Sequence, residues 1–306
     1  MLNLNRLRIL TEVASRGSFS AAAESLSYTQ SAVSQQIAAL EAETGVTLIE
    51  RLPRGVRLTP AGEVLLEYAE GIIARLHAAE AEMAAIAGLR GGQLRMASFP
   101  TAGATLMPLA IAIFRGQHPE VTLTLAEGEP EEIGPRLSAG EFDLALLFEF
   151  EGTSESLGPE LARVELFEDP MFLALAADHP LAARPALRLE DLRTEAWIQT
   201  SASSPCARHV VRSCHAAGFD PVVSFESDDY LTVQGLVAAG VGVALIPKLA
   251  LAGAREDIAI RALAPHNPVR TVVAATPHGT RLTAAAAAMR KILTDVATRY
   301  VGPELV

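Results

Sequence analysis

Small hydroxyl and amide side chains recur at helical spacing near the start of the chain. Apolar residues repeat every three or four positions over residues 30–43, which predicts a helix with one buried side. Ser31, Ser34 and Gln35 then lie on or beside the opposite side of that helix. A glutamine can bond bidentately to adenine in the major groove of DNA, and a serine can donate to a phosphate or a base edge. A solvated surface helix carries the same residue types, so this face indicates DNA binding only together with its neighbours.

Arginines cluster just beyond this predicted helix. Arg51, Arg54 and Arg57 belong to a segment that reads as two short strands around a Pro-Arg-Gly turn, the pattern of a wing. Clustered arginines are what phosphate binding requires. Residues 1–58 hold six arginines against five glutamates, whereas the whole chain has a net charge of −11. The start of the chain is therefore the place where DNA would bind.

Two shorter helical patterns precede the helix expected at 30–43. The first carries apolar residues from Leu7 to Ala14, and the second follows Ser18, which can cap it. Only residues 27–30 separate the second pattern from the third, which is the spacing of a helix-turn-helix. Together with the hairpin, residues 1–58 predict a winged helix-turn-helix domain.

A long helix is expected to begin at Thr59 and Pro60, because threonine can cap it and a proline at the first position leaves no N–H unpaired. It runs to about Gly88, and its apolar residues step by four and three positions, which is the seam of a coiled coil. Such a stripe is often core, but on a helix this long we expect it to join two chains. The residues assigned to dimerisation are Leu65, Ile72, Leu76 and Met83. Glycines at 88, 91 and 92 predict a hinge, so that residues 59–92 form a linker.

Residues 93–306 alternate β-rich and helical patterns, which predicts an α/β domain with parallel strands. In its second half the segments VELFE and MFLALAA are read as two strands. Loop-like stretches at 151–159 and 263–268 predict two crossings between two lobes, with a cleft between them. Lobe 1 is expected to comprise 93–160 and 268–306, and lobe 2 to comprise 161–267.

Composition and motifs argue against several other classes. The chain has 306 residues, half of them hydrophobic, which is more than one small module needs. It has no apolar run long enough to span a bilayer and no signal peptide, so we expect a cytoplasmic protein without a membrane partner. The motifs G-x-S-x-G, P-loop and G-x-G-x-x-G are absent, which argues against an enzyme. The histidines show no paired spacing, so no metal site is expected. A solute-binding protein would share the cleft, but it would need export and would not carry the N-terminal module.

One run of the chain matches a known family. The run SFSAAAESLSYTQSAVSQQIAALEAETGVTLIERLPRGVRLTPAGEVLLEYA closely resembles the winged helix-turn-helix of LysR-type transcriptional regulators, without gaps from Phe19 to Gly62. The two-lobed remainder is similar to the effector domain of that family, whose fold resembles type 2 periplasmic binding proteins. The resemblance implies a homodimer or homotetramer that binds an interrupted palindrome in double-stranded DNA and contacts RNA polymerase. It implies control by a small-molecule effector in the cleft rather than by a cofactor.

The resemblance also assigns the DNA-binding residues. The helix contacts fall on Thr29, Gln30, Ser31, Ser34 and Gln35, and the wing contacts on Arg51 and Arg54. A DNA contact by Arg57 is left open, because this side chain can pair with a neighbouring carboxylate instead. The family usually has proline in place of Ser31, which should alter base preference but not the docking mode.

Loops that face the predicted cleft supply the candidate effector residues. The first turn from strand to helix can hold an anion at the N-terminus of the helix, although it can also be an ordinary cap. An equivalent turn in the second lobe faces the same cleft, and Phe148 is either an apolar wall or core. One residue of the pair Asp228 and Asp229 can cap a helix; if the other lines the pocket, a ligand with an amine or several hydroxyls is favoured. The effector residues are Ser98, Pro100, Thr101, Phe148, Thr200, Ser201, Ser203, Asp228 and Val241.

Cys206 and Cys214 leave a second mode of control open. Peroxide-sensing members of the family carry two cysteines in this region, at a spacing one residue longer. Eight residues along one helix place two sulfurs about 12 Å apart, beyond disulfide reach without local unfolding. A thiol-redox regulator therefore stays as an alternative to a metabolite-responsive one.

Overall fold

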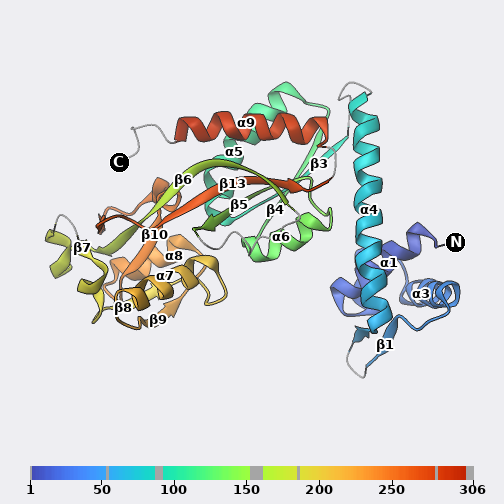
Figure 1. Cartoon of the computed structure of the whole chain (residues 1–306), viewed down its shortest axis with the longest axis horizontal. Coiled ribbons are helices and arrows are strands. Elements are labelled where there is room, and N and C mark those ends of the chain that lie inside the picture. The colour runs from blue at the N-terminus through green and yellow to red at the C-terminus, as the bar shows by residue number, and fades with distance from the viewer. Residues whose placement is uncertain are drawn as a thin grey trace. The chain divides into compact units, whose positions relative to one another are not determined.

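The computed structural model describes residues 2–52, 55–86, 92–151, 161–184, 187–279 and 282–300 (Figure 1). The chain divides into two compact units, Met1–Met83 with Ala139–Glu141, and Ala84–Ser138 with Phe142–Val306. Each unit has its own hydrophobic core. Within the described ranges, none of the helices combines the length and the apolar character that a membrane crossing requires.

The N-terminal unit begins with three short helices and a hairpin. The helices are α1 (Leu4–Arg16), α2 (Phe19–Ser25) and α3 (Gln30–Thr44), and the antiparallel hairpin is β1 (Ile49–Arg51) and β2 (Val56–Leu58). The side chains of Ser18 and Thr29 cap α2 and α3 by accepting backbone N–H bonds. The helices and the start of the hairpin share a core that includes Leu10, Val13, Ala22, Val33, Ile37, Leu40 and Leu48. The predicted winged helix-turn-helix is confirmed.

The long helix α4 (Pro60–Ile86) is fixed to the wing at its first turn. Thr59 caps it by accepting from the N–H of Gly62 at 3.1 Å, and its own N–H donates to the carbonyl of Leu48 at 2.9 Å. A Cβ added at Gly62 would lie 2.1 Å from that same carbonyl oxygen, so only glycine fits there. The hinge predicted at glycines 88, 91 and 92 falls mostly on residues 87–91, which lie outside the described residues.

Parallel strands form the first lobe of the C-terminal unit. Strands β3 (Gln93–Ser98), β4 (Thr122–Glu127) and β5 (Leu144–Phe150) are parallel, and they alternate with α5 (Pro100–Gln117) and α6 (Pro130–Ser138) as predicted. Strand β13 (Val269–Pro277) returns antiparallel beside β5. The last helix, α9 (Ala284–Tyr300), packs with α5 on one face of the sheet, while α6 covers the other (Figure 1).

One long strand carries the sheet into the second lobe. Strand β6 (Leu161–Ala176) is continuous where the sequence suggested two strands. It pairs with β13 as far as Pro170, and from Met171 onward it pairs with β10 (Ala244–Pro247). Residues 161–170 thus lie in the sheet of the first lobe, although the sequence placed them in the second. Strand β11 (Ile258–Arg261) also pairs with the second half of β6. Residues 152–160, the first expected crossing, lie outside the described residues.

The second lobe holds two further helices. Strand β8 (Ala196–Gln199) pairs in parallel with β9 (Val222–Glu226), and α7 (Pro205–Ala216) and α8 (Tyr230–Ala238) follow these two strands in turn. Its short elements are η2 (Pro180–Ala183), β7 (Leu187–Arg188), η3 (Leu189–Leu192), η4 (Lys248–Gly253) and β12 (Leu263–Ala264).

Candidate functional site

The outward side of α3 is polar and open to solvent. Gln30, Ser31 and Gln35 are exposed, Ser34 is half-buried, and Val33, Ile37 and Leu40 on the opposite side are buried. The hydroxyl of Thr29 is already engaged, since it accepts from the N–H of Ala32 at 3.2 Å as the helix cap. The helix therefore presents hydrogen-bonding side chains of small size that can approach base edges closely.

The wing contributes one arginine directly to this face. Arg51 at the end of β1 donates from Nη2 to the Oγ of Ser34 at 2.8 Å, and its guanidinium lies 5.2 Å from the centre of the Phe19 ring. Arg57 on β2 is bound to Glu50 at 2.7 Å, so its charge is locally compensated. Arg54, which the sequence also assigned to the wing, lies outside the described residues.

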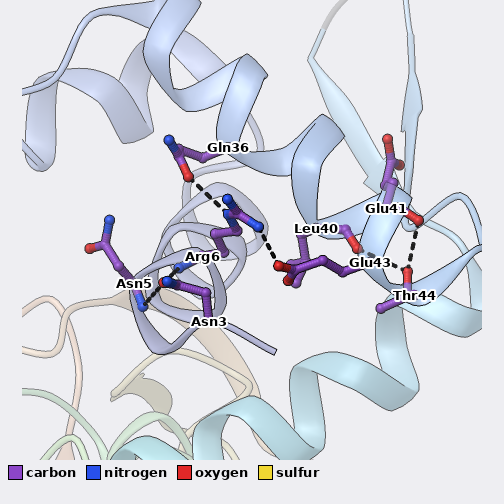
Figure 2. Close-up of polar contacts among 8 residues, drawn as sticks. All are labelled: Asn3, Asn5, Arg6, Gln36, Leu40, Glu41, Glu43 and Thr44. Atoms are coloured by element: carbon purple, nitrogen blue, oxygen red, sulfur yellow. Dashed lines mark hydrogen bonds and ion pairs between the residues drawn. The ribbon is translucent and has the colours of Figure 1, made fainter. Parts of the chain in front are cut away.

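Polar contacts at the sides and rear of α3 fix its orientation (Figure 2). Arg6 on α1 donates to Gln36 at 3.1 Å and forms an ion pair with Glu43. Glu41 accepts from the backbone N–H groups of Leu48 and Ile49 at the start of the wing. Sequence reasoning missed these residues, because nothing in a helical pattern marks an ion pair between residues 37 positions apart. They connect α3 with α1 and with the wing without using its outward side.

The apolar stripe along α4 changes character along the helix. Ala69 is fully buried in the core of the N-terminal unit, and Leu65 packs against that core. Beyond them Ile72, Leu76 and Met83 are exposed in the single chain, at 44%, 38% and 65% of their full surface. The first turns of the stripe thus belong to the winged domain, and the later turns present an uncovered apolar surface.

A pocket between the two lobes gathers residues from both. Five of the nine predicted effector residues line it, namely Pro100, Thr101, Phe148, Thr200 and Asp228. The other lining residues, which sequence reasoning did not single out for this role, are Phe99, Glu129, Cys206, Tyr230 and Arg270. The cavity among these side chains is about 10 Å³, which is room for about one water molecule. The surrounding side chains therefore have to move to admit even a small ligand.

The four other predicted residues do not line this pocket. Ser98 is buried and donates its hydroxyl to the carbonyl of Phe99. The N–H of Ser201 donates to Asp228, and Ser203 is exposed, with its carbonyl accepting from Arg208. The hydroxyl that caps α7 is instead that of Ser204, one residue further, which also bonds to Thr200. Val241 is 37% exposed.

Arg270 forms the floor of the pocket and is almost completely enclosed. Its Nε and Nη2 donate to Asp169 at 2.9 and 2.8 Å, and Nη2 also donates to the hydroxyl of Thr101 at 2.8 Å. The rings of Phe99 and Phe148 lie 5.0 and 4.4 Å from its guanidinium. The arginine thus joins β13, β6 and the start of α5 in a single buried network.

Two carboxyl groups of the pocket have different environments. Burial raises the pKa of Glu129 to about 7, Arg270 opposes that rise, and Asp228 adds to it. Asp228 accepts from the N–H of Ser201 at 2.8 Å, whereas Asp229 caps α8 through the N–H of Leu231. Of the acidic pair noted in the sequence, one residue therefore caps a helix and the other lines the pocket.

The two cysteines occupy different environments on α7. Cys206 lines the pocket, and Nη1 of Arg270 lies 3.8 Å from its sulfur. Burial raises the pKa of Cys206, although Arg270 opposes the rise. Cys214 is fully buried in the hydrophobic core, and burial raises its pKa to about 12. Both are free thiols.

Comparison with known proteins relates both units to one protein family. Residues 4–63 match the family model described as bacterial regulatory helix-turn-helix protein, lysR family, and residues 87–298 match the LysR substrate binding domain. The transcriptional dual regulator GltC of Bacillus subtilis is 31% identical over 248 residues, 81% of this chain and 81% of GltC. The DNA-binding transcriptional dual regulator OxyR of Escherichia coli is 32% identical over 259 residues, 83% of this chain and 82% of OxyR. A solved full-length OxyR variant from Pseudomonas aeruginosa has a TM-score of 0.72 at 23% identity, over 97% of this chain and 95% of that one. The chain belongs to the LysR family of bacterial helix-turn-helix transcriptional regulators.

Proposed function

We propose that this regulator reads its operator with the outward side of α3 and anchors to the DNA backbone with the wing. The observation that carries this proposal is the bond between Arg51 and Ser34, which places a wing guanidinium at the edge of the polar face. Gln30, Ser31 and Gln35 beside it are exposed and are available for base edges. The family usually has proline in place of Ser31, so we expect a base preference of its own for this chain.

We further propose that the regulator acts as a homodimer or homotetramer. Exposed Ile72, Leu76 and Met83 on α4 support pairing with a second chain, because they continue a stripe whose first part is already buried. A symmetric pair of recognition helices requires an operator with two half-sites, which is an interrupted palindrome. RNA polymerase is the further partner that transcription control implies.

We also propose that a small molecule in the pocket between the lobes controls DNA binding. Residues from both lobes line the pocket, so a ligand there can favour one arrangement of the lobes over another. Coupling energies between such sites are typically about 1–3 kcal/mol, which is enough for a several-fold change in DNA binding or bending.

Gel shifts with the full-length protein on the DNA upstream of its own gene test the DNA-binding part. We expect a specific shift for the wild type and its loss in Gln35→Ala. The matched control is Gln117→Ala, which removes an exposed glutamine from a helix of the C-terminal unit and should leave the shift unchanged. Equal shifts for all three proteins on operator and on unrelated DNA would contradict the proposal.

A thiol-redox mechanism is the second candidate, supported by the position of Cys206 in the pocket beside Arg270. Several relatives are named hydrogen peroxide-inducible genes activator. Peroxide would oxidise the thiol of Cys206 to a sulfenic acid and would itself be reduced to water. The raised pKa of Cys206 and the burial of Cys214 both weigh against a fast thiol switch. If peroxide changes the gel shift of the wild type but not that of Cys206→Ser, the redox mechanism replaces the metabolite one.

A further inference from the structure

Most hydrogen-bond donors of Arg270 are already bonded within the protein. Its Nε and Nη2 donate to Asp169 and Thr101, its Nη1 lies 3.8 Å from the sulfur of Cys206, and the neighbouring rings of Phe99 and Phe148 both contact it. Its charge is matched by Asp169 at 2.8 Å, and both side chains are almost fully buried. One N–H of Nη1 remains, but a carboxylate ligand that formed a two-point ion pair with Arg270 would have to displace Asp169, and that exchange would leave a buried acidic group without its counterion.

The groups in the pocket that remain available are acceptors. Among the described residues no hydrogen bond reaches the carboxyl of Glu129, although the side chain lines the pocket and is half-buried. Asp228 uses one oxygen for the N–H of Ser201 and lines the pocket as well. Among the described residues Arg270 is the cation that acts on Glu129, and its ion-pair partner is Asp169.

The hydroxyl of Tyr230 is an independent polar group at the same pocket. Its oxygen is buried, and within the described part of the chain it has no nitrogen or oxygen partner, although the thiol of Cys206, a weak hydrogen-bonding group, interacts with it. Buried hydroxyl groups are almost always hydrogen-bonded in native proteins, and an exception calls for a partner. Tyr230 begins α8 directly after the cap Asp229, so the backbone holds its ring in place.

We propose that the effector of this regulator carries a protonated amine, which binds Glu129 and Asp228 while the hydroxyl of Tyr230 bonds to the rest of the molecule. This inference rests on the proposed function, because it names the class of ligand for the same pocket. An ammonium group offers three donors and a compact positive charge, which matches two carboxyl groups that line the same pocket. It also relieves the repulsion between Glu129 and Asp228.

Binding of an amine has a definite pH dependence in this arrangement. The charged groups that act on Glu129 are Arg270, which favours its ionised form, and Asp228, Glu131 and Glu132, which disfavour it. With the pKa of Glu129 at about 7, most of the carboxyl is ionised at pH 8 and about a tenth of it at pH 6. Simple amines stay protonated over this range, so their affinity should fall about tenfold from pH 8 to pH 6.

Calorimetry with matched small probes tests the inference on the full-length protein. The probes are ethanolamine and 1,4-diaminobutane, the alcohols ethylene glycol and 1,4-butanediol, and the carboxylates glycolate and succinate. We expect saturable binding of an amine and none of the alcohols or carboxylates. Glu129→Gln should weaken the amine about tenfold or more, because it removes a charged hydrogen bond. Glu132→Gln makes the same charge change at a residue that does not line the pocket, and should keep the affinity within about twofold.

Each result decides the inference. Failure of both amines to bind, equal amine binding by the wild type and Glu129→Gln, or binding of a carboxylate in place of the amine would overturn it. The gel shift is measured on the same preparations without probe. A protein that shifts its operator but binds no amine refutes the ligand class alone, whereas a protein that shifts no operator refutes the proposed function.

Discussion

Arg270 and Asp169 form an ion pair 2.8 Å apart, with 2% and 1% of their side chains exposed, where two neighbouring strands pass between the lobes. Asp169 also accepts from the N–H of Leu249 at 3.1 Å, so it ties β6 to the segment after β10 as well. Arg270 thus lines the pocket, and its pair with Asp169 is part of the frame that joins the lobes.

Removal of Asp169 should therefore destabilise the C-terminal unit severely. Asp169→Ala leaves a buried guanidinium without its counterion, which costs about 3–5 kcal/mol of the free energy of unfolding. Urea unfolding followed by circular dichroism measures this loss. Glu50→Gln breaks the exposed pair with Arg57 and should leave the midpoint almost unchanged. Similar midpoints for the two variants would show that the buried pair contributes no more than a surface one.

Glu129 gives the stability a pH dependence of known sign. Burial raises the pKa of its carboxyl from 4.5 in the unfolded chain to about 7, so between these values the native state binds more protons. Stability contributed by this group therefore falls as pH rises from about 5 to 7. We expect Glu129→Gln to abolish about 1–3 kcal/mol of that fall, with screening by solvent taken into account. Urea unfolding at pH 5 and pH 8 checks this, and an unchanged difference between the two pH values would contradict it.

Gly62 should tolerate no side chain. Gly62→Ala places a Cβ 2.1 Å from the carbonyl oxygen of Leu48, so the first turn of α4 has to move, at a cost of about 1–3 kcal/mol. Gly71 on the same helix has no atom within 4 Å of such a Cβ, and Gly71→Ala should stabilise by about 0.5–1 kcal/mol. We expect the melting temperature to fall in Gly62→Ala and to rise in Gly71→Ala. Shifts of the same sign in the two variants would rule out steric conflict as the cause of the destabilisation at Gly62.

Arg51 should contribute both to affinity and to its dependence on salt. Because the guanidinium lies exposed beside Ser34, Arg51→Ala should weaken operator binding and lower the slope of log affinity against log salt by about one. Arg115→Ala removes the same charge from an exposed position on α5. Fluorescence anisotropy over a salt series makes the comparison. A slope unaffected by Arg51→Ala would mean that this side chain does not contact a phosphate.

The exposed part of the α4 stripe should control assembly. Leu76→Asp places a charge on the stripe and should shift the full-length protein toward monomer, since a desolvated carboxylate is costly. Arg75→Asp alters the neighbouring exposed position and serves as the control. Sedimentation velocity at several concentrations distinguishes the species. Equal dissociation by both variants would indicate general charge repulsion along α4.

The N-terminal unit could be predicted almost residue by residue, because its signals are local. Each signal that begins or ends a helix acts within one turn of the residues it affects. These signals are the N-caps Ser18, Thr29 and Thr59 and the C-cap Gly45. The alternation of strands and helices in the first lobe is equally local, and the parallel strands β3, β4 and β5 confirm it.

The pocket was only partly predictable, because its chemistry depends on residues distant in the sequence. Thr101 and Asp228 follow strands and could be expected near the cleft. Arg270 lies within a strand, among apolar neighbours, and its partner Asp169 is 101 residues away. No local pattern marks such a pair, and none marks Glu129, whose role depends on the burial of its carboxyl. The division of β6 into two strands was wrong because its backbone pairing continues through Asp169 and Pro170.

A strand shared by both lobes limits how the effector domain can move. Its ladder with β13 ends at Pro170 and its ladder with β10 begins at Met171, so a bend or twist of β6 at this point moves one lobe against the other and conserves both sets of bonds. Because β6 is continuous, the lobes cannot separate there. The C-terminal unit should therefore convert occupancy of a small pocket into a change of angle about β6.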